Sequence, residues 1–457
     1  MICILIKNFD ELIARKEREA REKALKLIEE GLLKADPKEA VKRAISFDGE
    51  ALIVDNRAYS FGGKLIVVGA GKATGKMAEA VEEKLGSKIF GGVIITPKGT
   101  ASQYRLKKIK LMEGDHPIPS VDNVKATKTI QELVSGLSED DVVLCLISGG
   151  GSALLTRPAE GIHLKDIQHT TQLLLRSGAS IDEVNAVRKH LSAIKGGQLA
   201  DTIYPAKLIS LIMSDVVGDS IQAIASGPTA PDISTFKDSI EILQRYDLWD
   251  AVTDTVHKRL SAGFKHEIHE TPKPGDKIFD NVHNMIVASN RASLNAMFDK
   301  ANELNLNSLI LTTYMEGEAR HVGRFVSSII REIYYHDKPI KKPAAVIAGG
   351  ETTVTVIGDG KGGRNQELVL GAAFGIQGLR GVAVASIGSD GIDGTCDAAG
   401  AIADGYTITK AKENGIDPFK HLKNNDSYTF FNMLGDCIFT GRTYTNVNDF
   451  TVAVITD

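Results

Sequence analysis

The sequence predicts an α/β protein of two domains. The chain has 457 residues, which is more than a single hydrophobic core normally holds. Apolar segments such as KLIVVGAG (64–71) and DVVLCLISGGG (141–151) end in glycine and lead into helical sequence. Strands that are apolar along their whole length and alternate with helices are typical of parallel sheets covered on both faces.

The first half of the chain begins with a helix and continues with alternating strands and helices. Residues 10–34 have apolar positions near helical spacing, Asp10 as a candidate N-cap and a charged face, so we expect a surface helix. The expected strands that follow are 64–71, 91–97, 141–151 and 208–219. Their spacing predicts a Rossmann-like first domain with a mostly parallel sheet.

The best candidate for a domain boundary is TPKPGDKI (271–278), which places two prolines and a glycine among charges. We therefore predict domains at 1–275 and 276–457. Beyond the boundary the alternation resumes, with expected strands at 284–290, 308–313, 344–356, 381–391 and the final TVAVITD.

Composition excludes several classes of function. The 54 basic and 58 acidic residues leave a formal charge of -4, without the basic excess of a nucleic-acid binder. No apolar run approaches the ~18 residues that span a bilayer. The four cysteines form no CxxC pair and suit free thiols in a reducing compartment. We expect a cytoplasmic protein that binds neither nucleic acid nor membrane.

The loop VVGAGKATGK (67–76) resembles a phosphate loop without matching one. The dinucleotide pattern GxGxxG needs a glycine where Thr74 stands, and the P-loop pattern needs other residues at Ala70 and Met77. A glycine turn before a helix still presents N–H groups to an anion, and Lys72 adds a mobile charge. The alternative is a tight turn with a solvated lysine.

The stretch SGGGSALL (148–155) is the stronger candidate for an anion site. Three glycines after a buried strand cost backbone entropy, which indicates close approach of another group. A nucleophile elbow would read GxSxG, and Ser152 lacks the second glycine, so a serine nucleophile is disfavoured. We predict a phosphate site at Ser148, Gly149, Gly150, Gly151 and Ser152.

Further charged and polar residues follow other predicted elements. Arg188 and Lys195 are seven residues apart on a predicted helix ending at 196–197, which would place both on one face toward a phosphate or toward solvent. Asp215 follows a strand and is a candidate base or metal ligand, with helix capping as the alternative.

Two later loops carry the remaining candidates. In GGETTVTVIGDGKGGRNQE a hairpin-like segment runs into glycines before Arg364 and Asn365, where an arginine suits carboxylate or phosphate recognition. Asp390 and Asp393 lie in a loop rich in carboxylates that suits a hard cation. Asn446, in TNVND, suits polar ligand contacts. From the residues alone we infer an Mg-nucleotide kinase or another phosphate-handling enzyme.

The motifs as a set resemble the glycerate 2-kinase family. They include GAGKA, GDHPIPSVDN, SGGGSALL, VRKHLSAIKGG, SDVVGDSIQAIASGPTAPD, GGETTVTV, GGRNQEL, SDGIDGTCDAAGA and TNVND. They occur in the order typical of that family across about residues 60–450. Four residues depart from the family pattern: Cys396 replaces a threonine, Arg442 and Tyr444 replace small or rigid residues, and His321 replaces a glutamate.

The resemblance implies a kinase that uses ATP and Mg²⁺ to phosphorylate D-glycerate at its 2-hydroxyl, giving 2-phosphoglycerate. It implies a second domain of the MOFRL type and an active site in the interdomain cleft. Lys72 and Arg364 match the family's implicated catalytic residues. A hydroxypyruvate reductase that uses NAD(P)H, or a non-catalytic binder of nucleotide or sugar acid, is the alternative.

These expectations define a predicted mechanism. The Gly149–Ser152 amides, together with Ser148 and Lys195, would bind the ATP phosphates, which Mg²⁺ would bridge to Asp390 or Asp393. Lys72 would neutralise the γ-phosphate, and Asp215 would orient or deprotonate the hydroxyl. Arg364, Asn365 and Asn446 would bind the substrate, although the roles of Lys72 and Arg364 are interchangeable at this stage. ATP and D-glycerate are the expected partners, with a homodimer possible.

Overall fold

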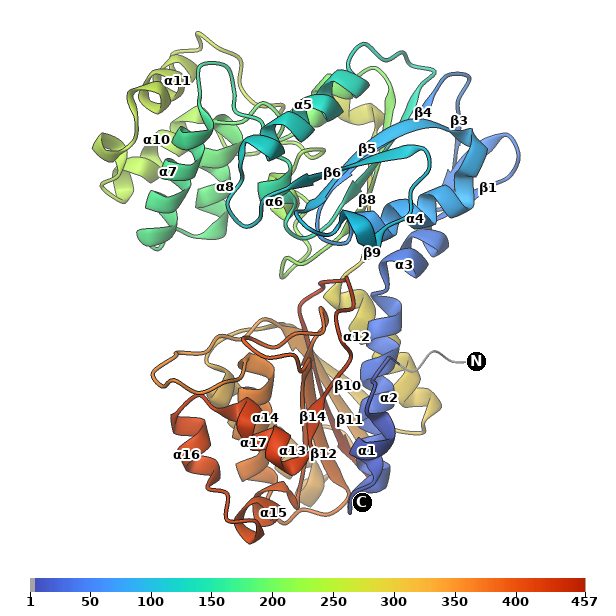
Figure 1. Ribbon diagram of the computed structural model, residues 1–457, viewed down its shortest axis with the longest axis vertical. Helices are drawn as coiled ribbons and strands as arrows, with labels where there is room; N and C mark the ends of the chain where they lie inside the picture. Colours follow the sequence, from blue (N-terminus) through green and yellow to red (C-terminus); the bar gives the residue numbers. More distant parts are fainter. Residues whose placement is uncertain (1–4, 457) are drawn as a thin grey trace. The chain divides into compact units, whose positions relative to one another are not determined.

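The computed structural model describes residues 5–456 and divides into two compact units. One unit is Pro37–Val287. The other combines the described residues up to Asp36 with those from Ala288 onward. Figure 1 colours the chain from blue to red and shows the blue N-terminal helix α2 within the unit that also holds the red C-terminal elements.

The unit Pro37–Val287 is built on a six-stranded sheet in the order β6-β5-β4-β7-β8-β9. Its strands are β4 (Leu65–Ala70), β5 (Ile89–Pro97), β6 (Ile109–Gly114), β7 (Val142–Ile147), β8 (Lys207–Met213) and β9 (Val282–Ala288). The four pairings from β6 to β8 are parallel. Numbered along the sheet this is the strand order 3-2-1-4-5-6, which confirms the predicted Rossmann-like arrangement.

Helices and a small sheet complete this unit. The helices are α3 (Pro37–Ala44), α4 (Thr74–Leu85), α5 (Val121–Val134), α6 (Gly151–Leu154), α7 (Leu164–Arg176), α8 (Ile181–His190), α9 (Gln198–Ile203), α10 (Phe236–Arg245) and α11 (Asp254–Phe264). Strands β4 and β7 are buried along their whole length, as their apolar sequence predicts. An antiparallel sheet that we did not predict is formed by β1 (Ile45–Phe47), β2 (Ala51–Val54) and β3 (Arg57–Ser60).

The second unit has a mixed six-stranded sheet in the order β10-β11-β15-β12-β13-β14. The strands are β10 (Asn307–Met315), β11 (Ala344–Gly350), β12 (Val382–Gly388), β13 (Gly400–Asp404), β14 (Cys437–Ile438) and β15 (Asp449–Ile455). The β10–β11 pair is parallel and the other pairs are antiparallel. This unit is therefore α/β as predicted, although its sheet is mixed.

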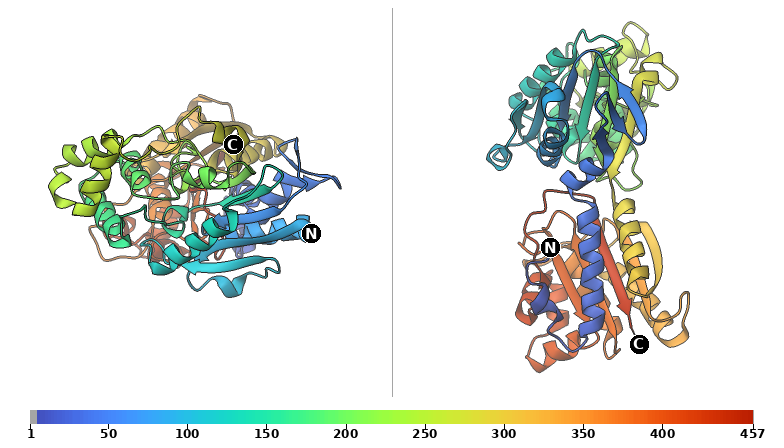
Figure 2. Two further views of the ribbon diagram at one scale, coloured as in Figure 1. Left: turned by 90° about the horizontal axis from the view of Figure 1, so that it is seen from above. Right: turned by 90° about the vertical axis from the view of Figure 1, so that its right-hand side faces the viewer.

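The helices of the second unit come from both ends of the chain. They are α1 (Phe9–Ile13), α2 (Arg18–Lys34), α12 (Asn290–Glu303), α13 (Ala319–His336), α14 (Arg364–Ile376), α15 (Thr407–Glu413), α16 (Pro418–Lys423) and α17 (Ser427–Leu434). The expected helix 10–34 is thus interrupted between α1 and α2. Figure 2 shows α2 running alongside the strands of this unit.

The N-terminal helices are fixed in this unit by a buried arginine. Arg21 donates hydrogen bonds to Asp404 Oδ2 (2.8 Å), Asp436 Oδ1 (2.6 Å) and the carbonyl of Leu12 (2.6 Å). The structure therefore differs from the expected division at 275/276 in two respects. Residues 5–36 pack with the C-terminal part of the chain, and β9, which we placed in the second domain, is an edge strand of the first sheet.

Among residues 5–456, no helix combines the length and apolar character needed to cross a membrane. Of the four cysteines, Cys145, Cys396 and Cys437 are free thiols, and Cys3 lies outside the described residues. Residues 351–356 form no hairpin; Thr353 instead makes an isolated parallel bridge with Glu318.

Candidate active site

The strand order of the first sheet brings two of the predicted loops together. Strands β4 and β7 are neighbours, with Ala70 paired to Ile147 at their carboxyl ends. The helix connections reverse direction between these two strands, and ligands of open parallel sheets bind at such a reversal. The GAGKA loop after β4 and the SGGGS loop after β7 therefore occupy the position that the fold reserves for a ligand.

The GAGKA loop is held by its own hydrogen bonds. The Gly71, Lys72 and Ala73 amides donate to the carbonyl of Ile95, the carbonyl of Gly149 and Oγ of Ser148, respectively. This loop consequently offers few amides to an anion. What it offers is the side chain of Lys72, which is exposed at the start of α4.

The glycine loop, in contrast, leaves amides available. Gly151 N–H donates to the carbonyl of Ser148 (3.1 Å). Within residues 5–456, the N–H groups of Gly149, Gly150 and Ser152 have no protein acceptor. Gly150 adopts a left-handed conformation at φ +84°, which glycine tolerates at little cost. Three free amides on one tight turn are suited to bind the oxygens of an anion.

The three glycines are also required by the packing of the protein itself. A Cβ at Gly149 would collide with the carboxylate of Asp215, and a Cβ at Gly151 would lie 2.8 Å from Cβ of Ala225. A Cβ at Gly150 would lie 3.1 Å from the ring of His116 and 3.3 Å from Cγ of Lys72. The close approach that the glycine run indicated is thus made by side chains of this chain, and it gathers Lys72 and Asp215 around the free amides.

The two serines of the loop have different surroundings. Ser148 is buried, and its Oγ accepts from the Ala73 amide (3.0 Å) and lies 3.2 Å from Oγ1 of Thr74. Its hydroxyl therefore joins the two loops to each other. Ser152 is half-buried, and its Oγ lies 3.2 Å from Oγ of Ser226.

Lys195 lies behind the glycine loop. Helix α8 ends at His190, so Lys195 is outside the helix and the expected shared face with Arg188 does not exist. The Lys195 ammonium donates to the carbonyls of Ser152 (2.6 Å) and Leu155 (3.0 Å). Burial, assisted by the nearby charge of Arg188, lowers the pKa of Lys195 to about 7. Its contacts are those of a cap on the carbonyl end of α6.

Asp215 belongs to a loop with backbone strain. Its carboxylate packs against Gly149, as described above, and the side chain is half-buried. Further along the same loop, Ala225 and Ser226 adopt positive φ values of 52° and 61°, which typically cost about 1–3 kcal/mol each. Oγ of Ser226 donates to Asn185 (2.9 Å). The surrounding structure therefore holds this loop firmly against Gly151.

In the second unit, Arg364 is held by two carboxylates. Its Nη2 donates to Asp449 Oδ1 (3.0 Å), its Nε bonds the other oxygen of Asp449, and Nη1 lies 2.8 Å from Glu351. Burial opposes the charge of Arg364, but the hydrogen bonds and carboxylates outweigh it and raise the pKa. Burial likewise raises the pKa of Asp449, to about 6, against the influence of Arg364. Arg364 is thus charged and oriented, with Glu351 as its more exposed partner.

Asn365 and Asp393 form a buried network rather than an open surface. Asp393 accepts hydrogen bonds from the Asn365 and Gln366 amides (3.1 and 2.8 Å), which caps the first turn of α14. Oδ1 of Asn365 accepts from Ser386 (2.6 Å). Burial raises the pKa of Asp393 to about 7. The hydrogen bonds of both side chains therefore serve to stabilise the packing of α14.

Asp390 and Asn446 are more accessible. Oδ1 of Asp390 accepts from the Ile392 amide (3.1 Å), and Oδ1 of Asn446 accepts from the Asn448 amide (3.2 Å). Among residues 5–456, no group of three or more His, Cys, Asp or Glu side chains is arranged to hold a metal ion. Magnesium that arrives with a nucleotide needs only one or two carboxylates, because phosphate and water supply its other ligands. Asp390 suits this role, whereas the oxygens of Asp393 face helix amides.

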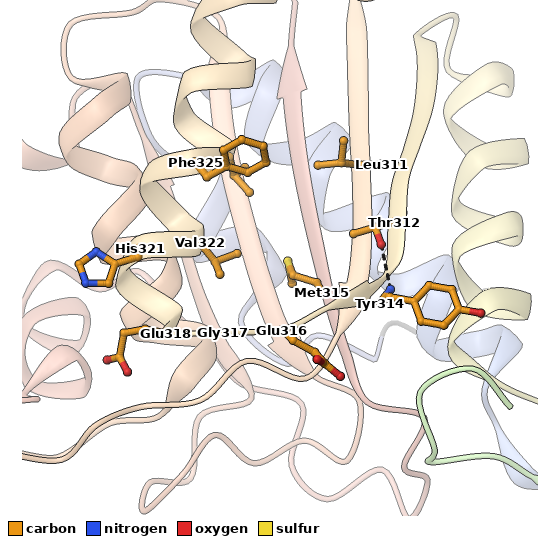
Figure 3. Close-up of a pocket in the computed structure, with 11 residues that line it drawn as sticks. Leu311, Thr312, Tyr314, Met315, Glu316, Gly317, Glu318, His321, Val322 and Phe325 are labelled. Carbon is orange, nitrogen blue, oxygen red and sulfur yellow. Dashed lines mark hydrogen bonds between the residues drawn. The ribbon is translucent and has the colours of Figure 1, made fainter. Parts of the chain in front are cut away.

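A separate pocket lies between β10 and α13. It has a volume of about 590 Å³. Figure 3 shows Leu311, Val322 and Phe325 along its length, with Glu316 and Glu318 on the segment below them. Apolar walls with two carboxylates would repel a polyphosphate, so the pocket is not the predicted phosphate site.

Comparison with known proteins places this geometry in a family. Residues 23–261 match a family described as a domain of unknown function (DUF4147), and residues 344–449 match the MOFRL family. The chain is 43% identical over 437 residues to a protein of Pyrococcus horikoshii named glycerate 2-kinase, with 95% of this chain and 97% of the relative covered. The chain belongs to the glycerate 2-kinase family.

Two further comparisons agree with this membership. A Thermotoga maritima protein named D-glycerate 2-kinase is 44% identical over 392 residues, covering 86% of this chain and 91% of the relative. A crystal structure of glycerate kinase from Thermotoga maritima matches with a TM-score of 0.86 at 40% identity, covering 95% of this chain and 99% of that one. The resemblance inferred from the motifs is therefore confirmed for the family and the fold.

The structure also shows how one departure from the family pattern is accommodated. Cys396 Sγ lies 2.9 Å from Nε2 of Gln366 and 3.0 Å from the carbonyl of Asp393, so the thiol makes the polar contacts open to a threonine hydroxyl. Burial raises the pKa of this thiol.

Sequence reasoning missed Asp449, Glu351 and His116. Asp449 lies in the quoted TNVND motif and Glu351 in GGETTVTV. The signal that would have found the two carboxylates is the isolated cation Arg364, which required carboxylate partners to be oriented.

Proposed function

We propose that this chain is a kinase that transfers the γ-phosphoryl group of ATP to the 2-hydroxyl of D-glycerate, giving 2-phosphoglycerate and ADP. The observation that carries the proposal is the family membership at 43% identity over nearly the whole chain. The free amides of the glycine loop beside Lys72 support it, because phosphoryl transfer depends on donors placed around the phosphates.

In the proposed mechanism, the glycine loop binds the polyphosphate. The N–H groups of Gly149, Gly150 and Ser152 donate to phosphate oxygens, and Lys72 neutralises the charge that develops during transfer. Ser148 acts by joining this loop to the GAGKA loop, and Gly151 by making the turn. We propose that Lys195 supports the loop through its carbonyl contacts instead of contacting phosphate.

Asp215 is the proposed partner of the attacking hydroxyl. Its carboxylate packs against Gly149, within the same cluster as the free amides. A carboxylate there is suited to orient the 2-hydroxyl and to accept its proton as the bond to phosphorus forms.

The second unit is proposed to supply the remaining groups. Arg364 would exchange the contact of its Nη1 with Glu351 for the carboxylate of the substrate, while Asp449 keeps the guanidinium oriented. Asn446 is a proposed further substrate contact, whereas Asn365 would act only by fixing the start of α14. The proposal requires residues of both units to serve one reaction.

A divalent cation, with Mg²⁺ as the expected ion, would accompany ATP. It would neutralise the β- and γ-phosphate oxygens, which lowers the cost of charge in the transition state. Asp390 is the proposed protein ligand in this chain. Asp393 does not suit the role, since both of its oxygens already accept hydrogen bonds from α14.

The deciding experiment is incubation of the purified chain with ATP, MgCl₂ and D-glycerate, with ³¹P and ¹H NMR of the product. A phosphate on C2 is the expected result, and its absence under saturating substrates would contradict the proposal. A parallel incubation with NADH and hydroxypyruvate tests the reductase alternative, for which we expect no oxidation of NADH. Binding of ATP without turnover would instead identify a non-catalytic binder.

We also propose a cytoplasmic location, in keeping with the free thiols. Substrates are the proposed small-molecule partners, and a homodimer remains a prediction that light scattering of the purified chain would test.

A further inference from the structure

The loop between β6 and α5 reaches the glycine loop, although the proposed mechanism does not use it. Asn123, fully buried in the first turn of α5, holds this loop with its side-chain amide. Its Oδ1 accepts from the amides of Asp115 and Ser120 (both 2.9 Å), and its Nδ2 donates to the carbonyls of Asp115 and Ala153 (both 3.0 Å). Since Ala153 belongs to α6, the loop is fixed directly to the helix that follows the glycines.

The residue that this loop delivers is His116. Its Cδ2 and Nε2 atoms lie 3.1 and 3.2 Å from the position that a Cβ on Gly150 would take, and Cγ of Lys72 lies 3.3 Å from the same point. The ring therefore contacts the backbone whose amide is free. Within residues 5–456, the His116 ring has no hydrogen bond, ion pair or ring partner.

Partial burial and the nearby charge of Lys72 both disfavour the charged form of His116 in the free protein. Partial burial, and then the charge of Lys72, lower the pKa of His116 below its ordinary 6.5. Two carboxylates belong to the same region: Asp115 is the neighbour of His116 in sequence, and Asp215 packs against Gly149, the residue before Gly150. A polyphosphate on the free amides would add several negative charges, which reverses the balance and favours the imidazolium.

We propose, resting on the proposed kinase function, that His116 is a phosphate-contacting residue of this site and takes up a proton as the polyphosphate binds. The imidazolium donates a hydrogen bond to a phosphate oxygen opposite Lys72. The glycine at position 150 then serves two purposes, because it lets the ring and the ligand approach one backbone unit.

The test compares His116→Phe with wild type and with His269→Phe. Phenylalanine preserves a ring against Gly150 but removes the charge and the hydrogen bond. His269 is an exposed histidine of the same unit, outside the site. Titration calorimetry with Mg–AMP-PNP, and separately with inorganic tripolyphosphate, measures Kd. We expect His116→Phe to weaken both probes about tenfold, the scale of one lost charge-assisted contact, and His269→Phe to leave them unchanged.

A second measurement follows the proton. Titrations at pH 7.5 in two buffers of different ionisation enthalpy give the protons bound with AMP-PNP. We expect wild type to take up a fraction of a proton more than His116→Phe does. His116→Gln, which keeps a donor without the charge, is expected to recover part of the affinity and none of the uptake.

The outcomes separate the two proposals. If wild type binds neither probe, the proposed function fails. If wild type binds both probes and His116→Phe binds them equally well, or if the two proteins take up the same number of protons, the role of His116 is overturned. If His116→Phe has a raised KM for ATP and an unchanged KM for D-glycerate relative to wild type, this would support a contact confined to the nucleotide.

Discussion

Lys72 and Arg364, the two cations carried over from the family, are held in very different ways. Lys72 is exposed. Its loop is held by main-chain hydrogen bonds in which the lysine side chain takes no part. Arg364 is held by Asp449, which is fully buried, and by Glu351. Removing either cation should lower turnover strongly, but only one of the two removals should affect stability.

For Lys72→Ala we expect turnover to fall at least about 100-fold, a typical loss for one transition-state contact. The free energy of unfolding should change by less than about 0.5 kcal/mol, because the side chain is exposed. Steady-state assays and urea denaturation measure both quantities. Lys84→Ala, an exposed lysine near the far end of α4, is the control and should be neutral in both. Near-normal turnover in Lys72→Ala would remove this lysine from the mechanism.

For Arg364→Met we expect turnover to fall by a similar factor and stability to fall by about 3–5 kcal/mol, because Asp449 is left buried without its partner. The double variant Arg364→Met/Asp449→Asn should regain much of the stability and none of the turnover. Urea denaturation beside the kinase assay separates these effects. Full stability in Arg364→Met alone would show that the pair contributes nothing to folding.

The buried carboxylate of Asp393 predicts a pH dependence of stability. Because its pKa is raised to about 7 in the folded protein, the folded state binds more protons than the unfolded state between about pH 4 and 7. The free energy of unfolding should therefore fall as pH rises through this window. The pKa of Asp449, raised to about 6, acts in the same direction. The test is urea denaturation at pH 5 and 7.5. Between these two pH values, the free energy of unfolding of Asp393→Asn should fall by about 2–4 kcal/mol less than that of wild type. Equal pH slopes would contradict the assignment.

At the level of elements, one asparagine connects α5, the His116 loop and α6. Asn123 makes its hydrogen bonds from a fully buried position, so Asn123→Ala leaves several main-chain groups unsatisfied. We expect a loss of about 2–4 kcal/mol in the free energy of unfolding, together with weaker binding of AMP-PNP. Lys128→Ala, an exposed position on the same helix, serves as the control for both measurements. Unchanged nucleotide affinity in a destabilised Asn123→Ala would mean that the loop does not support the site.

The observed elements also show which sequence signals were sufficient to predict a strand or a helix correctly. The continuous apolar runs of β4 and β7 predicted buried parallel strands because no polar side chain interrupts them, and glycine marked their ends. The prediction that this helix continues as far as Lys195 was wrong, because α8 ends at His190. There, Oγ of Ser192 accepts from the Ile194 and Lys195 amides and offers the backbone a turn in place of a helix.

The site was less accessible to sequence reasoning than the fold. The glycines indicated close approach, but which groups approach depends on loops that are distant in the chain. Asp215 and His116 reach the glycine loop from different strand ends, and periodicity carries no information about such contacts. Lys195 illustrates the same limit, because a basic residue near a phosphate motif was expected to face the ligand and instead caps carbonyls.

At the level of the whole molecule, the chain begins in one unit, then forms the whole of the other unit, and finally completes the unit in which it began. The unit completed by residues from Ala288 onward needs the first helices, because Arg21 supplies the buried ion-pair partner of Asp404 and Asp436. We expect a fragment of 288–457 to unfold without a cooperative transition. The same fragment joined through a flexible linker to residues 1–36 should show one. Circular dichroism during heating measures this, and cooperative unfolding of the short fragment would contradict it.

Domain prediction from a proline-rich stretch failed for the same topological reason. TPKPGDKI has the composition of a linker, yet β9 follows it and joins the first sheet at its edge. Composition reports local flexibility, whereas membership of a unit depends on pairing with strands far away in the chain.

The placement of α2 has a consequence during translation. This helix is among the first segments to leave the ribosome, while β12 and β15, two of the elements against which it packs, are made near the end of the chain. At ~5–20 residues per second, its apolar side stays without these two strands for tens of seconds. A nascent chain of this protein should therefore be a client of ribosome-associated chaperones until the final strand is synthesised.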